Sequence, residues 1–159
     1  AQQSKEPNLA IQSVTKKEHL KNIQAFARKS HTESRFFKDL NFDRIKCEKL
    51  YEKWIHRDFE KGHILGFYPV EGEIVKGYVT FIMESLDVAK IGLIAVEDDY
   101  RGRGIGSELL NKTIATSKKL NAKKLVVVTQ ATNTSALRLY EKAGFRISGV
   151  KLWFHKWFA

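Results

Sequence analysis

Apolar residues along this chain recur at two different spacings, and the changes between them predict an alternation of helices and strands. Between residues 43 and 61 they recur three and four positions apart, which is the period of an amphipathic helix. We therefore expect helices at about Lys17–Lys29 and Asp43–Lys61, joined by an irregular stretch at His31–Leu40. Cys47 lies on the apolar stripe of the second helix, so the pattern favours a place in the core over chemistry for its thiol.

Shorter apolar runs bounded by glycine and polar residues predict strands. They lie at Leu9–Val14, His63–Val70, Ile74–Met83, Val88–Val96 and Lys124–Thr129, with a final strand region through Phe145–Phe158. A turn through Glu71–Glu73 indicates a hairpin, so we expect the middle strands to be antiparallel.

Two further helices are expected, from about Ile105 to Lys119 and from Asn133 to Ala143. The first of them connects Val88–Val96 to Lys124–Thr129, and such a crossover should make these two strands parallel and right-handed. The pattern as a whole predicts an α+β fold with a central mixed sheet, mostly antiparallel, flanked by helices.

A glycine-rich loop joins the strand that ends at Val96 to the following helix, and it has the chemistry of an anion site. It contains Arg101, Gly102, Arg103, Gly104, Ile105, Gly106 and Ser107. Glycine lets a backbone approach an anion closely, and a helix N-terminus offers it unpaired N–H groups. Glycine-rich turns before helices also arise for packing alone, so the loop by itself leaves both roles open.

Two motifs in this order resemble those of the GNAT family of N-acetyltransferases. The first is the Arg-x-x-Gly-x-Gly order of Arg101, Gly104 and Gly106 after an apolar strand, which is similar to the pyrophosphate-binding motif of that family. The second is an Asn-capped helix that starts at Asn133 and reads Tyr-x-x-x-Gly-Phe from Tyr140 onward. The resemblance covers about residues 75 to 158 and implies the GNAT fold, transfer from acetyl-CoA to an amine, and a sheet splayed at the acetyl-CoA site.

The resemblance also implies where acetyl-CoA binds. Backbone groups of Ile94, Ala95 and Val96 would meet the pantetheine arm, and the Ile94 N–H would face the thioester carbonyl. The glycine loop would hold the pyrophosphate. The Asn133 amide would touch the pantetheine arm, although this residue has an equally simple role as a helix N-cap.

Catalytic roles follow from the same resemblance. Tyr140 would protonate the leaving thiolate, since a phenol is a workable donor. Its alternative is packing, because Leu137, Tyr140 and Ala143 also form an apolar stripe. For the base that deprotonates the amine, Glu84 and Glu97 are candidates, while both also suit exposed strand-end charges. An acceptor of low pKa would need no base.

Three segments, at residues 31–36, 90–95 and 129–134, resemble the dTDP-fucosamine acetyltransferase branch of the family. In that branch the acceptor is the amino group of a dTDP-4-amino-4,6-dideoxyhexose. Arg35, Phe36 and Lys38 would then bind the pyrophosphate and stack on a base or sugar. A surface loop anchored by phenylalanines is the competing interpretation. The chain departs from that branch in two respects. Its N-terminal region is shorter, and it carries the complete sequence of residues 96–101 before the glycines of the loop.

Composition limits the kinds of ligand and partner that the chain is expected to bind. The chain has 28 Lys and Arg against 18 Asp and Glu, a net charge of +10, which suits an anionic nucleotide sugar. The basic residues are dispersed and no nucleic-acid motif accompanies them, so we expect no nucleic-acid partner. One cysteine and unclustered histidines imply no metal. No apolar run approaches eighteen residues, so we expect no membrane span and a cytoplasmic protein.

We expect a single acetyltransferase domain over residues 9–159 after a flexible N-terminal segment at 1–8. Alternatives to the amino-sugar acceptor are a protein N-terminus, a lysine or another small amine, and a module that binds CoA or polyanions without turnover. The segment Val150–Phe158 is aromatic on both faces of its expected strand, which suits pairing with another subunit and equally suits burial under the N-terminal helices. The resemblance to the family favours a homodimer.

Overall fold

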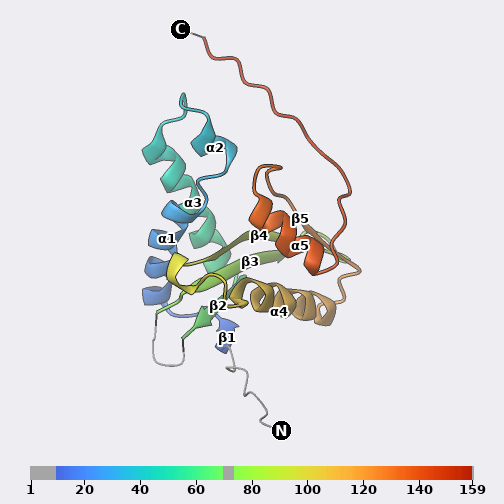
Figure 1. Ribbon diagram of the computed structural model, residues 1–159. Helices are drawn as coiled ribbons and strands as arrows, with labels where there is room; N and C mark the ends of the chain where they lie inside the picture. The colour runs from blue at the N-terminus through green and yellow to red at the C-terminus, as the bar shows by residue number, and fades with distance from the viewer. Residues whose placement is uncertain (1–9, 70–73, 159) are drawn as a thin grey trace.

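A central sheet runs through the molecule with helices packed on both of its faces (Figure 1). The computed structural model describes residues 10–69 and 74–158, so the segment 1–8 and the expected turn Glu71–Glu73 lie outside the described residues. Within the described ranges the strands are ordered along the sheet as along the chain: β1 (Ala10–Ser13), β2 (Ile64–Tyr68), β3 (Gly77–Met83), β4 (Val88–Val96) and β5 (Lys124–Val127).

The helices are α1 (Lys17–Ser30), α2 (Arg35–Lys38), α3 (Arg44–Glu60), α4 (Ile105–Lys119) and α5 (Thr134–Lys142), with a 3₁₀ turn η1 (Asp98–Tyr100) before α4. The neighbours from β1 to β4 pair antiparallel, and β4 pairs with β5 parallel through the crossover helix α4. The predicted parallel pair and mixed sheet are therefore confirmed.

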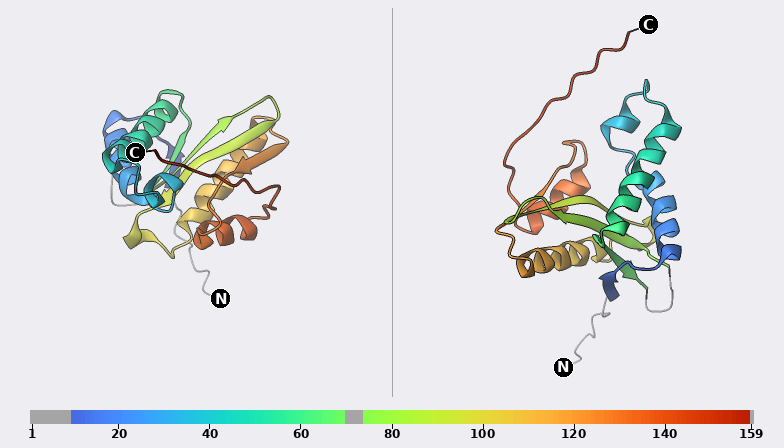
Figure 2. Two further views of the ribbon diagram at one scale, coloured as in Figure 1. Left: turned by 90° about the horizontal axis from the view of Figure 1, so that it is seen from above. Right: turned by 180° about the vertical axis from the view of Figure 1, so that it is seen from behind.

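Side chains alternate between the two faces of the sheet and build a core on each. On one face α1 and α3 lie side by side (Figure 2) and bury Ile23 and Ile55 against Tyr78 of β3. On the other face Leu109 of α4 and Tyr140 of α5 share a core with the next residue of β3, Val79. No helix in the described part of the chain is both long and apolar enough to cross a membrane.

The predicted final strand through Phe145–Phe158 is wrong. Residues 145–158 pair with no strand among the described residues and form an extended segment that leaves the body beyond α5 (Figure 1). Its apolar composition does favour a strand, but a strand needs a neighbouring edge to bond with, and the segment runs past α2 instead of along β5. The stretch predicted to be irregular, His31–Leu40, contains the single helical turn α2.

Candidate active site

The parallel pair β4–β5 comes apart half-way along β4. The last matched residues are Ile91 and Val127, so residues 92–96 have β3 on one side and no strand on the other within the described chain. The strand also has a bulge at this point, because Val79 pairs with Ile94 but Phe81 with Ile91. We call residues 88–91 the paired half of β4 and residues 92–96 its open half.

Thr80 holds the bulge. Its Oγ1 accepts a hydrogen bond from the backbone N–H of Leu93 at 3.0 Å, and the side chain is fully buried. A Cβ at Gly92 would lie 2.6 Å from the same Oγ1 atom, so only glycine leaves room for this contact. This contact fixes the bulge between β3 and β4 at the point where β4 parts from β5.

Backbone N–H and C=O groups in the open half point alternately toward β3 and toward the side where β5 is missing. The Glu97 N–H donates to the Lys76 carbonyl at 2.9 Å, which makes these two residues a hydrogen-bonded pair of the antiparallel ladder. Two residues along, Ala95 must bond to Tyr78, because such pairs alternate with non-bonded ones. The N–H and C=O groups of Ile94 and Val96 are then directed away from β3, toward the side that β5 has vacated. Ala95 contributes its backbone to the sheet instead.

The glycine loop follows the open half after Glu97 and the turn η1. Gly102 and Gly104 have φ angles of +74° and +79°, and an added Cβ at either would meet no atom within 4 Å. Gly104 is the N-cap of α4, so the N–H groups of Ile105, Gly106 and Ser107 in the first turn have no partner within the helix. A backbone in this conformation, with open space in front of it and the positive end of a helix behind it, fits an anion.

The two arginines of the loop are held by local contacts. Arg101 Nε donates to the Val96 carbonyl at 3.1 Å, and its Nη1 lies 3.0 Å from Asp98 Oδ1. Arg103 Nη2 donates to the Asp99 carbonyl at 2.8 Å. Both side chains are exposed, so they bring positive charge to the loop while they brace it.

The helix α5 lies beside the start of α4. A Cβ at Gly106 would be 3.7 Å from Leu139, so the first turn of α4 packs closely on α5. Asn133 caps α5, because its Oδ1 accepts hydrogen bonds from the Ala136 N–H at 3.2 Å and from the Ser135 hydroxyl at 3.0 Å. The capping role is thus confirmed for its oxygen, and its amide nitrogen is the group available for a ligand.

Tyr140 is buried where α5 meets the core of the open half. Only 7% of it is exposed, its ring lies 5.7 Å from that of Phe145, and it shares a hydrophobic cluster with Ile94 and Val96. Burial raises the pKa of Tyr140 to about 12, so the hydroxyl keeps its proton at neutral pH. The packing role and the proton-donor role are compatible at this position.

The two candidate bases lie at opposite ends of β4. Glu97 follows the open half, and its carboxylate is 2.7 Å from the Lys76 ammonium; hydrogen bonding to Glu97 raises the pKa of Lys76. Glu84 lies beside the start of β4, with its N–H bonded to the Val88 carbonyl and its carboxylate 3.1 Å from Lys90. Six residues of strand, about 20 Å, separate Val88 from Ile94, so the structure does not bring Glu84 to the open half.

The expected acceptor residues are engaged in contacts within α2 and its surroundings. The Arg35 guanidinium stacks on Trp153 at 3.8 Å and on Phe36 at 4.8 Å, and Lys38 lies 3.0 Å from Glu33. Figure 1 places α2 near the start of α3, at the end of that helix remote from the sheet. These side chains are therefore not gathered with the glycine loop.

Sequence reasoning missed a buried carboxylate at the point where the strands part. Asp58 near the end of α3 is 2% exposed, and Arg57 donates to its Oδ1 from Nε at 2.8 Å and from Nη2 at 2.7 Å. A Cβ on Gly92 would lie 3.8 Å from the other oxygen of Asp58. The signal was present in the sequence, because Asp58 occupies the core-facing stripe that includes Tyr51 and Ile55.

A second missed feature supports β3 opposite the open half. His31 Nε2 and the Tyr78 hydroxyl share a hydrogen bond of 2.7 Å, and the His31 ring stacks on Tyr51 with centroids 5.1 Å apart. Burial lowers the pKa of His31 to about 4, so the imidazole is neutral at pH 7. Because the pair lies 47 residues apart in sequence, no local pattern could have revealed it.

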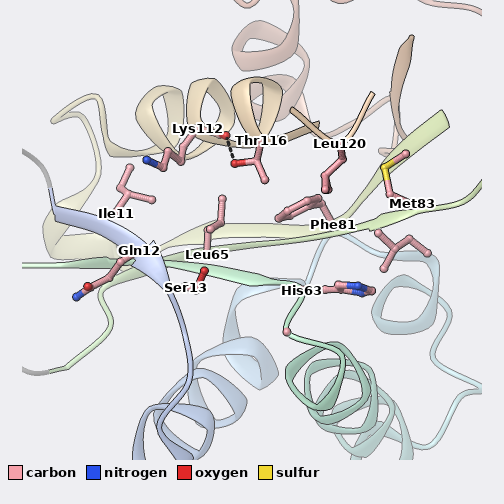
Figure 3. Close-up of a pocket in the computed structure, with 12 residues that line it drawn as sticks. Ile11, Gln12, Ser13, His63, Leu65, Phe81, Met83, Lys112, Thr116 and Leu120 are labelled. Atoms are coloured by element: carbon pink, nitrogen blue, oxygen red, sulfur yellow. Dashed lines mark hydrogen bonds between the residues drawn. The ribbon is translucent and has the colours of Figure 1, made fainter. Parts of the chain in front are cut away.

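A separate pocket of about 560 Å³ lies away from the glycine loop (Figure 3). Its walls come from β1, from the ends of β2 and β3, and from the second half of α4, where Lys112, Thr116 and Leu120 face Leu65 and Phe81. The pocket contains none of the residues expected to bind a ligand.

Comparison with known proteins agrees with this geometry. The family model described as "Acetyltransferase (GNAT) family" matches residues 24–145. The chain belongs to the GNAT family of acetyltransferases. Among solved structures it is similar to a putative acetyl transferase from Pyrococcus furiosus, with a TM-score of 0.71 and 24% identity over 92% of this chain and all of that one. The predicted GNAT fold is thereby confirmed.

Curated relatives of this GNAT chain have several names. The spore coat polysaccharide biosynthesis protein SpsD of Bacillus subtilis is 26% identical over 85% of this chain and 46% of its own length. An uncharacterized N-acetyltransferase of Methanocaldococcus jannaschii is 32% identical over 70% of this chain and 50% of its own length. Human N-alpha-acetyltransferase 30 is 42% identical over 35% of this chain and 15% of its own length. The chain spans half or less of the length of these relatives.

Proposed function

We propose that this chain is an acetyl-CoA-dependent N-acetyltransferase and that its acceptor is the amino group of a nucleotide-linked amino sugar of the dTDP-4-amino-4,6-dideoxyhexose type. The observation that carries the activity is the open half of β4, where the Ile94 backbone and the Val96 N–H have no strand partner among the described residues, followed after the turn η1 by the glycine loop at the start of α4. A solved GNAT structure from Elizabethkingia anophelis, 29% identical over 61% of this chain with a TM-score of 0.56, has acetyl-CoA bound.

The residues present fit acetyl-CoA along its length. The open space over Gly102 and Gly104 and the N–H groups of the first turn of α4 suit a pyrophosphate. The N–H and C=O groups of Ile94 and the N–H of Val96 suit the two amides of pantetheine, which would bond to this edge as a strand does, while the Val96 carbonyl already accepts from Arg101. The amide nitrogen of Asn133 would add a donor beside them.

Acetyl-CoA supplies an activated acyl group, and the protein would supply position and proton donors. The Ile94 N–H would donate to the carbonyl oxygen on which negative charge develops. The Tyr140 hydroxyl, protonated at neutral pH, would give its proton to the leaving sulfur as the amine displaces it directly. The amine loses one proton in the same reaction. Glu97 at the end of the open half is the better placed of the two candidate bases, although it is paired with Lys76.

Two observations favour the amino-sugar acceptor. The name of SpsD, which matches most of this chain, is that of a polysaccharide biosynthesis protein. The net charge of +10 attracts a nucleotide sugar and repels polyamines and lysine-rich peptides. The similarity of a shorter stretch to N-alpha-acetyltransferase 30 favours a protein N-terminus as the second candidate.

The test is a thiol-release assay with acetyl-CoA and a panel of dTDP- and UDP-linked amino sugars, beside peptides and polyamines. We expect release only with an amino sugar. Release with peptides alone would replace the proposed acceptor by the second candidate. Binding of acetyl-CoA without release by any acceptor would overturn the proposed acceptor and favour a CoA-binding module without turnover.

A further inference from the structure

Two segments that are far apart in the sequence meet at the end of the molecule remote from the sheet. Residues 35–46, which comprise α2 and the first residues of α3, lie beside residues 150–158 (Figures 1 and 2). The side chains of His155 and Trp157 both donate to Asp39 Oδ2, at 2.7 and 3.0 Å, and hold the two segments together. We call these two ranges the apolar tip.

The apolar tip exposes large apolar side chains from both of its segments. Leu40 is 94% exposed and Phe154 is 88% exposed. Among the described residues, eight of the thirteen exposed large apolar side chains lie in the tip. The other six are Ile45, Val150, Leu152, Trp153, Trp157 and Phe158. Single exposed apolar residues are ordinary, but so many at one end of a molecule indicate a surface that is covered in use.

Positive charge accompanies the apolar side chains of the second segment. Residues 101–159 contain 12 Lys and Arg against 2 Asp and Glu, whereas residues 1–100 contain 16 of each. The later part of the chain therefore carries the whole net charge of +10. In the tip, Lys151 and Lys156 form no ion pair with any described residue. Their charge is available to an anionic partner.

The first segment of the tip is closer to electrical balance. Lys38 lies 3.0 Å from Glu33, and Arg44 lies 3.5 Å from Glu48. The carboxylate of Asp39 is engaged by the two bonds to the second segment. The first segment therefore contributes mainly apolar side chains, and the second contributes both apolar side chains and unpaired charge.

An anionic lipid surface matches this combination. Its headgroups attract lysines, and the acyl boundary beneath them covers aliphatic and aromatic side chains. Trp side chains, two of which lie in the tip, are favoured at this depth. A nucleic acid would contact the lysines and stack on the rings, but it would not cover the aliphatic side chains of Leu40 and Leu152.

We propose that the apolar tip binds the surface of an anionic lipid membrane, with its exposed apolar side chains at the acyl boundary and Lys151 and Lys156 among the headgroups. Binding of this kind needs no segment that crosses the bilayer. The tip lies at the end of α3 remote from the sheet (Figure 1), so the membrane meets the molecule away from the glycine loop.

The first test is flotation of the full chain with phospholipid vesicles in a density gradient. We expect the protein to float with vesicles of phosphatidylcholine and phosphatidylglycerol. Vesicles of phosphatidylcholine alone should bind it at least about 10-fold more weakly, because they offer the lysines no anionic surface. Lys151→Gln combined with Lys156→Gln should reduce this preference, and raised salt should reduce it for the unmodified chain.

A matched pair of variants tests the apolar contribution. Leu152→Ser removes an exposed apolar side chain of the tip without changing the charge, and it should weaken binding to the anionic vesicles by about 10-fold. Leu86→Ser is the control, because Leu86 is 95% exposed between β3 and β4, outside the tip. That variant should bind as the unmodified chain does.

Trp fluorescence reports the depth of binding. Lipids brominated in the acyl chain should quench the emission of Trp153 and Trp157, because both side chains reach the acyl boundary in the proposed complex. Binding without quenching would show attraction by charge alone and would overturn the proposed insertion.

Failure of the unmodified chain to float with the anionic vesicles would overturn the proposal, as would equal losses for Leu152→Ser and Leu86→Ser. Tighter binding to a single-stranded RNA than to the anionic vesicles would also overturn it, in favour of a nucleic-acid partner. None of these measurements requires acetyl transfer, so their outcome is independent of the proposed function.

Discussion

The two halves of β4 belong to one strand but differ in their neighbours. In the paired half, residues 88–91 bond to β3 on one side and β5 on the other, and Ala89 and Ile91 are buried. In the open half, residues 92–96 keep β3 but lose β5, and the Ile94 backbone and the Val96 N–H have no strand partner in the described part of the chain. In the proposed site a strand would bind its ligand because it lacks a neighbour, and its side chains would take no direct part.

The difference between the two halves of β4 depends on the residues where they meet, at Gly92. The paired half needs only apolar residues that fill the core, whereas the open half begins with the contact of Gly92 with Thr80 and ends at the glycine loop. Variants of the open half and its surroundings should therefore affect binding and turnover at positions where ordinary packing rules predict little.

The largest expected effect is on turnover. Tyr140→Phe keeps the ring that packs beside the open half and removes the hydroxyl, so acetyl-CoA should still bind while kcat falls by about 10²- to 10⁴-fold. A steady-state thiol-release assay measures kcat, and calorimetric titration measures the affinity for acetyl-CoA. An unchanged kcat would assign Tyr140 to packing alone.

The second-largest effect is expected on acetyl-CoA affinity, from a substitution in the glycine loop. Gly104→Val puts a β-branched side chain at a φ of +79° and into the open space over the loop, and we expect acetyl-CoA affinity to fall by at least about 10²-fold. Gly62→Val is the matched control, because Gly62 also has a positive φ, +68°, with no atom within 4 Å of an added Cβ, and lies outside the loop, between α3 and β2. Equal affinities for the two variants would remove the loop from the binding site.

The junction itself is expected to affect stability. Gly92→Ala would push Thr80 away from the Leu93 N–H, and we expect a loss of about 2 to 3 kcal/mol in the free energy of unfolding. Gly149→Ala, where an added Cβ meets no atom within 4 Å, should change it by less than about 0.5 kcal/mol. Urea denaturation compares them, and similar values would mean that the bulge is not held by this contact.

Acid should weaken the support beneath the open half. The pKa of His31 is about 4 in the folded protein and about 6.5 when unfolded, so the unfolded state binds the proton more readily and stability falls as pH drops from 7 toward 4. By pH 5 the loss from this group should be about 2 kcal/mol. His31→Phe should show that much less acid dependence in urea denaturation, and an identical dependence would contradict the shift.

How far the sequence was informative differs between local and distant features. The glycine loop, the cap at Asn133 and the position of Tyr140 were predictable because each depends on a few consecutive residues. The strand expected at Phe145–Phe158 failed because the composition of a segment does not tell which edge it pairs with. Glu84 was a reasonable candidate by type, but the sequence did not show how far along β4 the strands part.

The bulge at Gly92 also resets the phase of the strand. Ile91 and Ile94 both point into the core beside α4, although they are three residues apart, while Leu93 and Ala95 point to the α1 and α3 side. Strict alternation of side chains from Ile91 onward would therefore place every side chain of the open half in the wrong layer. Loss of Gly92 would restore the count and leave a regular ladder, in which Leu93 alone stands opposite Thr80 and the side chains of residues 94–96 keep the layers that they have now.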